Sequence, residues 1–134
     1  MSARAKATLA ACIYVLAIFG LAMVPGTSRT PDDARLSLAD VARNLLHLPL
    51  YGGLAFMLRR AARAHARILS MSLATGVLLT GVIVGSVDER IQSHTPGRSA
   101  SMGDLALDFI ALFAVVGALW IRDRNSSRQP HEHH

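Results

Sequence analysis

Long apolar runs alternate with short polar segments along the whole chain. The runs cover residues 8–24, 45–58, 68–87 and 105–121 and contain almost no charge. Polar residues do not recur inside them at the 3.6-residue spacing of a helix that lies on a water-soluble core. The second run is shorter than the roughly 20 residues needed to cross a bilayer, but it reaches that length if its helix begins near residue 38. The pattern therefore predicts four membrane-spanning helices, at about 8–24, 38–58, 68–87 and 104–121.

The linkers between these spans are short, so consecutive spans must run antiparallel. The predicted fold class is all-α, a four-helix transmembrane bundle formed by residues 1–124. The remaining residues, 125–134, are polar and are predicted to be a disordered tail. Composition agrees with a membrane location: 51% of the 134 residues are hydrophobic and only 17% are charged, whereas a soluble domain carries about 25% charged residues.

Three segments match the capping box, in which a hydroxyl residue is followed three positions later by an acid that helps to satisfy the free amides of a helix start. They are TPDD at 30–33, SLAD at 37–40 and SMGD at 101–104. The first two predict a short interfacial helix followed by the start of the second span. The third predicts the start of the fourth span.

Basic residues are concentrated on one side of this topology. The segments before the first span, between the second and third spans, and after the fourth span hold nine of the fourteen basic residues, and the other side holds seven of the nine acids. Basic loops stay in the cytoplasm, so both termini are predicted inside and the two acidic loops outside. The net charge of +5 then reflects topology and contact with anionic lipid, and no nucleic-acid partner is predicted.

Polar residues of three spans fall at the same outer depth. The second span carries polar residues three and four positions apart, and the third and fourth spans carry pairs four positions apart, so each set shares one helix face. Such residues usually face the bundle interior or a wet cavity. We predict an outward-facing polar pocket lined by Arg43, Asn44, His47, Asp88, Glu89, Gln92, Arg98, Asp104 and Asp108. Two structural roles stay open: a solvated salt-bridge network for the charged residues, and a core position for His47.

The segment SVDERIQSHTPGRSASMGDLALD, residues 86–108, resembles the signature of VanZ-like membrane proteins. That signature is an acidic pair followed by glutamine, a proline-glycine-arginine turn, serines, and an aspartate that opens the last helix. The matching residues are Asp88, Glu89, Gln92, Arg98, Ser101 and Asp104. NLLHLPLYGGL, residues 44–54, resembles the second motif of the family. The chain departs from the family at Asp108, where asparagine is usual, at Ala111, where glycine is usual, and near Arg43, where lysine is frequent.

The resemblance implies a multi-pass protein of the bacterial inner membrane. The family is named for a member linked to low-level resistance to teicoplanin, a glycopeptide that binds a lipid-linked cell-wall precursor. We therefore expect a cell-envelope protein that binds a phosphate-bearing lipid or lipid-linked precursor, with a link to glycopeptide resistance. Arginines at the outer end suit phosphate binding. The alternative is an intramembrane hydrolase or transferase with Asp88 or Glu89 as general base and His47 or His94 as its partner. The sequence shows no nucleophile motif, which favours binding and leaves catalysis open.

No cofactor and no metal site are predicted. Cys12 is the sole cysteine, and the tail histidines His131, His133 and His134 lack a rigid framework. Besides lipid, the one partner predicted is a second copy of the chain. It would pack through a stripe of small residues that includes Gly81 and Gly85.

Overall fold

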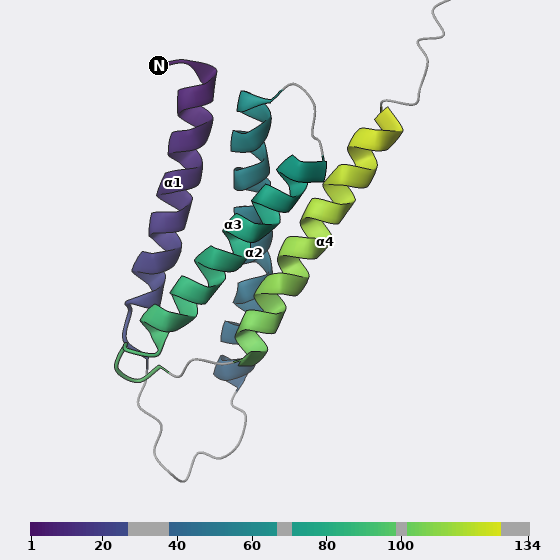
Figure 1. Cartoon of the computed structure of the whole chain (residues 1–134). Coiled ribbons are helices and arrows are strands. Elements are labelled where there is room, and N and C mark those ends of the chain that lie inside the picture. The colour runs from purple at the N-terminus through teal and green to yellow at the C-terminus, as the bar shows by residue number, and fades with distance from the viewer. Residues whose placement is uncertain (27–37, 67–70, 99–101, 127–134) are drawn as a thin grey trace, which may run out of the picture.

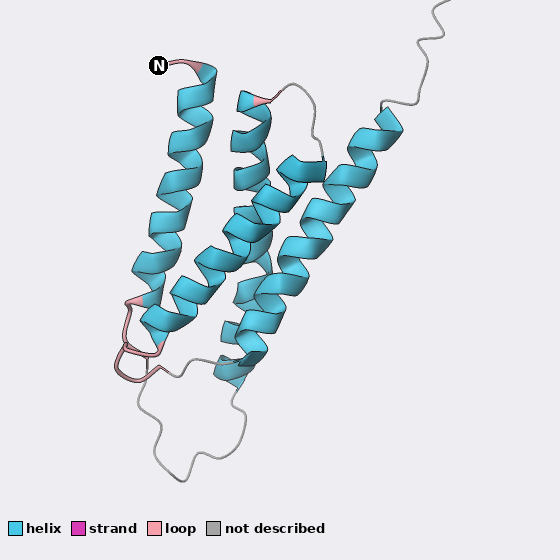
Figure 2. Cartoon of the chain, in the orientation of Figure 1, coloured by secondary structure: helices cyan, strands magenta, loops and turns pink. Residues whose placement is uncertain are grey.

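The structure is a computed structural model that describes residues 1–26, 38–66, 71–98 and 102–126, with the backbone alone for residues 38–44 and 126. Within these ranges the chain forms four antiparallel helices: α1 Ala3–Ala22, α2 Leu38–His65, α3 Met71–Gln92 and α4 Met102–Ser126 (Figure 1). Every other described residue lies in a loop or turn, and these ranges contain no strand (Figure 2). The prediction of an all-α four-helix bundle is confirmed.

The helices extend beyond the apolar runs that predict them. α1 begins five residues before the run, with the Ser2 side chain accepting a hydrogen bond of 3.2 Å from the Ala5 amide as N-cap. α2 continues through an arginine- and alanine-rich segment to His65, because both residue types favour helix. α4 ends at Ser126, five residues after its apolar run. Hydropathy marks the part of a helix that suits lipid, whereas backbone hydrogen bonding continues past it. The predicted interfacial helix lies outside the described residues.

Within the described residues, three helices are long and apolar enough to cross a membrane: α1, α3 and α4. Their outer faces expose large apolar side chains such as Leu16, Ile83 and Phe113, each more than half exposed. Surfaces of this kind suit lipid and not water. α2 has 28 residues, about 42 Å at 1.5 Å per residue, but its polar ends lower its mean hydropathy. That α2 also spans the membrane stays a prediction.

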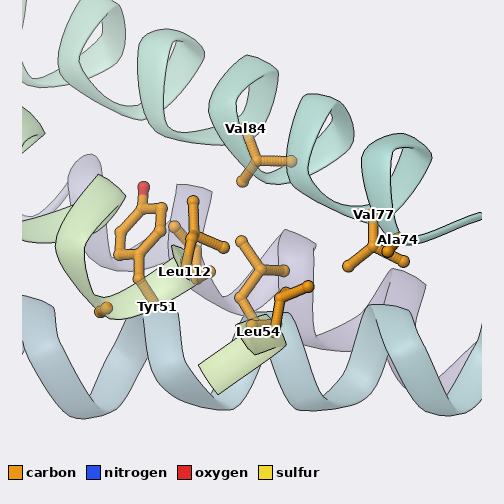
Figure 3. Close-up of a cluster of buried hydrophobic side chains, with 10 residues drawn as sticks. Tyr51, Leu54, Ala74, Val77, Val84 and Leu112 are labelled. Carbon is orange, nitrogen blue, oxygen red and sulfur yellow. The ribbon is translucent and has the colours of Figure 1, made fainter. Parts of the chain in front are cut away.

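The apolar core runs along the inside of the bundle, where α2 contacts the other three helices. Tyr51 and Leu54 of α2 and Leu112 of α4 are completely buried there, facing Val84 of α3 (Figure 3). Close to Tyr51, the buried side chains change from apolar to polar at the end of the bundle where α1 and α3 end and α4 begins. The core therefore positions a polar cluster at that end.

Gly81 permits the close approach of α3 to α4. A Cβ atom at Gly81 would lie 2.6 Å from Cδ2 of the fully buried Leu112, and one at Gly85 would lie 3.4 Å from the Tyr51 ring. A Cβ atom at Gly76 would have no other atom within 4 Å. Gly81 and Gly85 therefore pack against α4 and α2 of the same chain. A homo-oligomer that uses this stripe of small residues stays a prediction.

We expect Gly81→Ala to lower the free energy of unfolding by about 1–3 kcal/mol, the usual effect of overpacking. Gly76→Ala is the matched control, because both changes add the same helix propensity and only one adds a clash. Thermal unfolding of both variants in detergent measures the difference. Equal melting temperatures would show that α3 and α4 can separate at no cost.

Candidate functional site

Five buried polar residues from three helices form what we call the polar cluster. They are His47 and Tyr51 of α2, Asp88 and Gln92 of α3, and Asp108 of α4, all at least nine-tenths buried. Each pair on one helix is separated by four residues, which places both members on the face turned toward the neighbouring helices. The cluster lies at the end of the bundle opposite the basic ends of α2 and α4 (Figure 1).

His47 and Asp108 join α2 to α4. The distance between His47 Nδ1 and Asp108 Oδ1 is 2.8 Å. When Asp108 is ionised, its carboxylate can only accept, so His47 Nδ1 then donates this hydrogen bond. The His47 ring stacks on Tyr51 with 6.1 Å between centroids and 4° between planes. These two contacts fix the orientation of the imidazole.

Asp88 joins α3 to α2. Its Oδ2 accepts hydrogen bonds from the Tyr51 hydroxyl at 2.9 Å and from Gln92 Nε2 at 3.1 Å. The second bond follows from the four-residue spacing on α3, whereas the first exists only because α2 and α3 pack together. Both bonds are made to Oδ2, so neither donor contacts the second carboxylate oxygen, Oδ1.

Within the described part of the chain, one oxygen of each aspartate accepts no hydrogen bond. These atoms are Asp88 Oδ1 and Asp108 Oδ2, both fully buried. Among the described side chains, no lysine or arginine forms an ion pair with either carboxylate. A buried carboxylate oxygen without a donor costs free energy that the fold must supply elsewhere. The arrangement suits a cation, or a donor group of a ligand, better than it suits a bare pair of acids.

The structure brings four of the nine predicted site residues into the polar cluster: His47, Asp88, Gln92 and Asp108. Glu89 and Asp104 are buried at the same end of the bundle, and each has a further partner. Arg43 and Asn44 belong to α2, but their side chains lie outside the described part. Sequence reasoning missed Tyr51. Tyr51 lies four residues, or one helical turn, after His47. This spacing alone could have placed Tyr51 on the same helix face as His47.

The ninth predicted residue, Arg98, lies in the turn after α3. Its Nε donates a 2.9 Å hydrogen bond to the backbone oxygen of Val24, just beyond the end of α1. Thr95 Oγ1 donates to Ala22 O at 3.0 Å, and the Gly26 amide donates to Pro96 O at 3.0 Å. The polar stretch between α3 and α4 therefore fastens its turn to the end of α1, a role that the sequence did not predict.

The turn geometry depends on two glycines. Gly97 has a φ of 71°, and a Cβ atom on it would overlap the backbone of Gly26. A left-handed residue in so close a contact has to be glycine. The nearby His94 is exposed, and its ring bonds to the Arg90 backbone oxygen and to Ser93. Of the two histidines considered as acid–base partners, only His47 lies in the polar cluster.

The fold and the site together define a small helical-bundle protein with membrane-length apolar helices and a buried polar cluster at one end. Comparison of the chain with protein-family models, with curated proteins and with solved structures finds no significant match. The resemblance to VanZ-like proteins therefore stays a prediction from the two sequence motifs.

Proposed function

We propose that the chain is a VanZ-like membrane protein of the bacterial cell envelope that binds a phosphate-bearing lipid or lipid-linked envelope precursor. The observation that carries the proposal is the polar cluster, which three helices bury at one end of an otherwise apolar bundle. Buried titratable groups in a membrane protein are expensive and usually functional. The headgroup would bind where Arg98 overlies this end.

Arg98 is suited to hold the phosphate. Its Nε bond to Val24 O fixes the guanidinium plane, and the terminal nitrogens form no hydrogen bond with any described residue. Asp88 lies close enough to attract the guanidinium electrostatically. A guanidinium oriented in this way can present two parallel donors to phosphate oxygens, which an ammonium group cannot do. The buried acids would accept hydrogen bonds from hydroxyl or amine groups of the same headgroup.

The distribution of charge supports an outward-facing site. The end opposite the polar cluster carries Lys6 of α1, Arg59 and Arg63 of α2, and Arg124 of α4. Because basic ends stay in the cytoplasm, the polar cluster would face the outer leaflet of the inner membrane with both termini inside. Lipid-linked cell-wall precursors are exposed on that side, which is where a link to glycopeptide resistance would arise.

A second candidate function is an intramembrane hydrolase or transferase. The observation in its favour is the 2.8 Å bond between His47 and Asp108, because a carboxylate that orients an imidazole is the usual arrangement of a histidine general base. This geometry makes His47 the base and Asp108 its positioning residue, in place of Asp88 or Glu89. A bound lipid recovered partly as its hydrolysis product would favour this candidate.

We expect Arg98→Lys to reduce co-purified phosphate-bearing lipid about ten- to a hundredfold, the effect of losing a charge-assisted contact. The measurement is mass spectrometry of lipid per mole of protein, after extraction in a mild detergent. Arg90→Lys is the matched control, because Arg90 is an exposed arginine at the same end whose side chain forms no hydrogen bond with the described residues.

Both variants should keep the wild-type melting temperature to within a few degrees, so that a difference in lipid reports binding. Full lipid occupancy in Arg98→Lys would remove the basis of the headgroup site. Equal losses in the two variants would indicate a general effect of surface charge and would also count against the proposal.

A further inference from the structure

We propose that His47, Asp88 and Asp108 form a binding site for one divalent transition-metal ion of the Zn²⁺ or Mn²⁺ class. Each residue comes from a different helix and offers one ligand atom, and the three atoms all lie within 4.8 Å of one another. This site goes beyond the proposed lipid binding and does not depend on it. Four features of the polar cluster support it.

The first feature is the spacing of the ligand atoms. Bonds of about 2.0–2.2 Å from Zn²⁺ to nitrogen and oxygen place neighbouring ligands roughly 3–3.5 Å apart. His47 Nδ1 and Asp108 Oδ1 are already 2.8 Å apart. The three ligand atoms lie within 4.8 Å of one another, which is close to that spacing.

The second feature is charge. Asp88 is 2% exposed and Asp108 is fully buried, and two like charges at this separation repel strongly where water is excluded. Each has one oxygen that accepts no hydrogen bond from any described residue, namely Asp88 Oδ1 and Asp108 Oδ2. A divalent cation between them would neutralise both charges and provide a partner for both oxygens. No described lysine or arginine does this by a direct ion pair.

The third feature is the set of residues that orient the ligands. Metal-binding carboxylates and imidazoles are normally held by hydrogen bonds from their other polar atoms. Tyr51 and Gln92 hold Asp88 through Oδ2, and the stacked Tyr51 ring orients the His47 imidazole. The candidate ligand atoms are then Asp88 Oδ1, Asp108 Oδ2 and His47 Nδ1, which would give up its proton when a metal ion binds.

The fourth feature is the chemical character of the ligands. One imidazole and two carboxylates favour Zn²⁺, Mn²⁺ or Fe²⁺, whereas Mg²⁺ and Ca²⁺ favour oxygen ligands alone. Three protein ligands also leave a coordination position open, as in catalytic zinc sites. An exogenous oxygen, such as one from a phosphate headgroup, could occupy it.

The test is Zn²⁺ binding to the full-length protein in detergent after treatment with a chelator. The background carries His131→Ala, His133→Ala and His134→Ala, because the tail histidines would otherwise bind Zn²⁺ themselves. Titration calorimetry and elemental analysis should give one Zn²⁺ per chain. Asp88→Asn and Asp108→Asn should each weaken binding about a hundredfold or more, which is the upper end of the effect of removing an orienting residue. His94→Ala, an exposed histidine at the same end, is the matched control and should bind as the background does.

Both Asn variants keep the size of the side chain, and circular dichroism and melting temperature establish that they fold. If one of them does not fold, the other and His47→Gln carry the test. Co²⁺ adds an independent readout, since its visible absorption should appear in the background protein and disappear in the folded variants. Absence of stoichiometric Zn²⁺ binding, or binding that these changes leave intact, would overturn the metal site. Arg98→Lys should still bind Zn²⁺, so the metal proposal and the lipid proposal can fail separately.

Discussion

Asp123→Ala should destabilise the bundle by about 3–5 kcal/mol, because it would leave the buried Arg59 guanidinium without the carboxylate that it binds. Arg59 of α2 is only 5% exposed, and its Nη2 donates to Asp123 Oδ2 of α4. Arg63 Nη1 adds a second bond of 3.1 Å to Oδ1 of the same carboxylate. Without Asp123, the Arg59 guanidinium would remain buried with no anion among the described residues. Its Nε also has no hydrogen-bond partner among them.

Thermal and denaturant unfolding in detergent measure this effect, and Arg63→Ala is the control. The Arg63 side chain is 45% exposed, so its removal should cost less than about 1 kcal/mol, as for other surface pairs. The double change Arg59→Met with Asp123→Leu should recover much of the loss, because an apolar pair avoids the desolvation of both charges. If Asp123→Ala and Arg63→Ala cost the same, the pair is not a buried link between α2 and α4.

Tyr51→Ala should cost a similar amount, about 3–5 kcal/mol, as expected when a fully buried aromatic ring is deleted. The ring lies in the apolar core, while its hydroxyl group reaches Asp88. Tyr51→Phe separates the two contributions, since it keeps the ring and removes one donor from a buried carboxylate. We expect about 1–3 kcal/mol for that loss. Melting curves in detergent provide both values.

Tyr14→Phe is the control for Tyr51→Phe. Tyr14 also donates its hydroxyl across helices, at 3.0 Å to the Leu50 backbone oxygen, but the bond is partly exposed and its acceptor is neutral. The cost there should be smaller. A larger loss in Tyr14→Phe would mean that the bond to Asp88 contributes little to stability. Tyr51→Phe should also weaken Zn²⁺ binding about tenfold if Tyr51 orients Asp88 as a ligand.

Two motifs of this chain resemble the VanZ-like pattern, in which asparagine is usual at the position of Asp108. An asparagine could still bond to His47, but it would remove one of the two buried carboxylates. The metal site proposed above depends on that second charge. Whether position 108 holds an aspartate or an asparagine would therefore decide whether this end of the bundle attracts a cation.

The sequence by itself determined the class of structure. Four apolar runs predicted four helices, because a membrane-length run leaves no alternative that satisfies every backbone group. Spacing within each helix predicted which polar residues share a face, and the antiparallel order brought three such faces to one end. His47, Asp88, Gln92 and Asp108 could be grouped from this information alone. Helix ends were predicted less well, since they depend on hydrogen bonding beyond the apolar part.

Only the tertiary structure decided which groups touch. Spacing along a helix gives the face of a residue, but not the rotation and tilt that bring it opposite a residue of another helix. The pairing of His47 with Asp108, the bond from Tyr51 to Asp88 and the ion pair of Arg59 with Asp123 all depend on that geometry. The same reason explains why no metal motif could be seen in the sequence: the three candidate ligands come from three helices, and only packing brings them together.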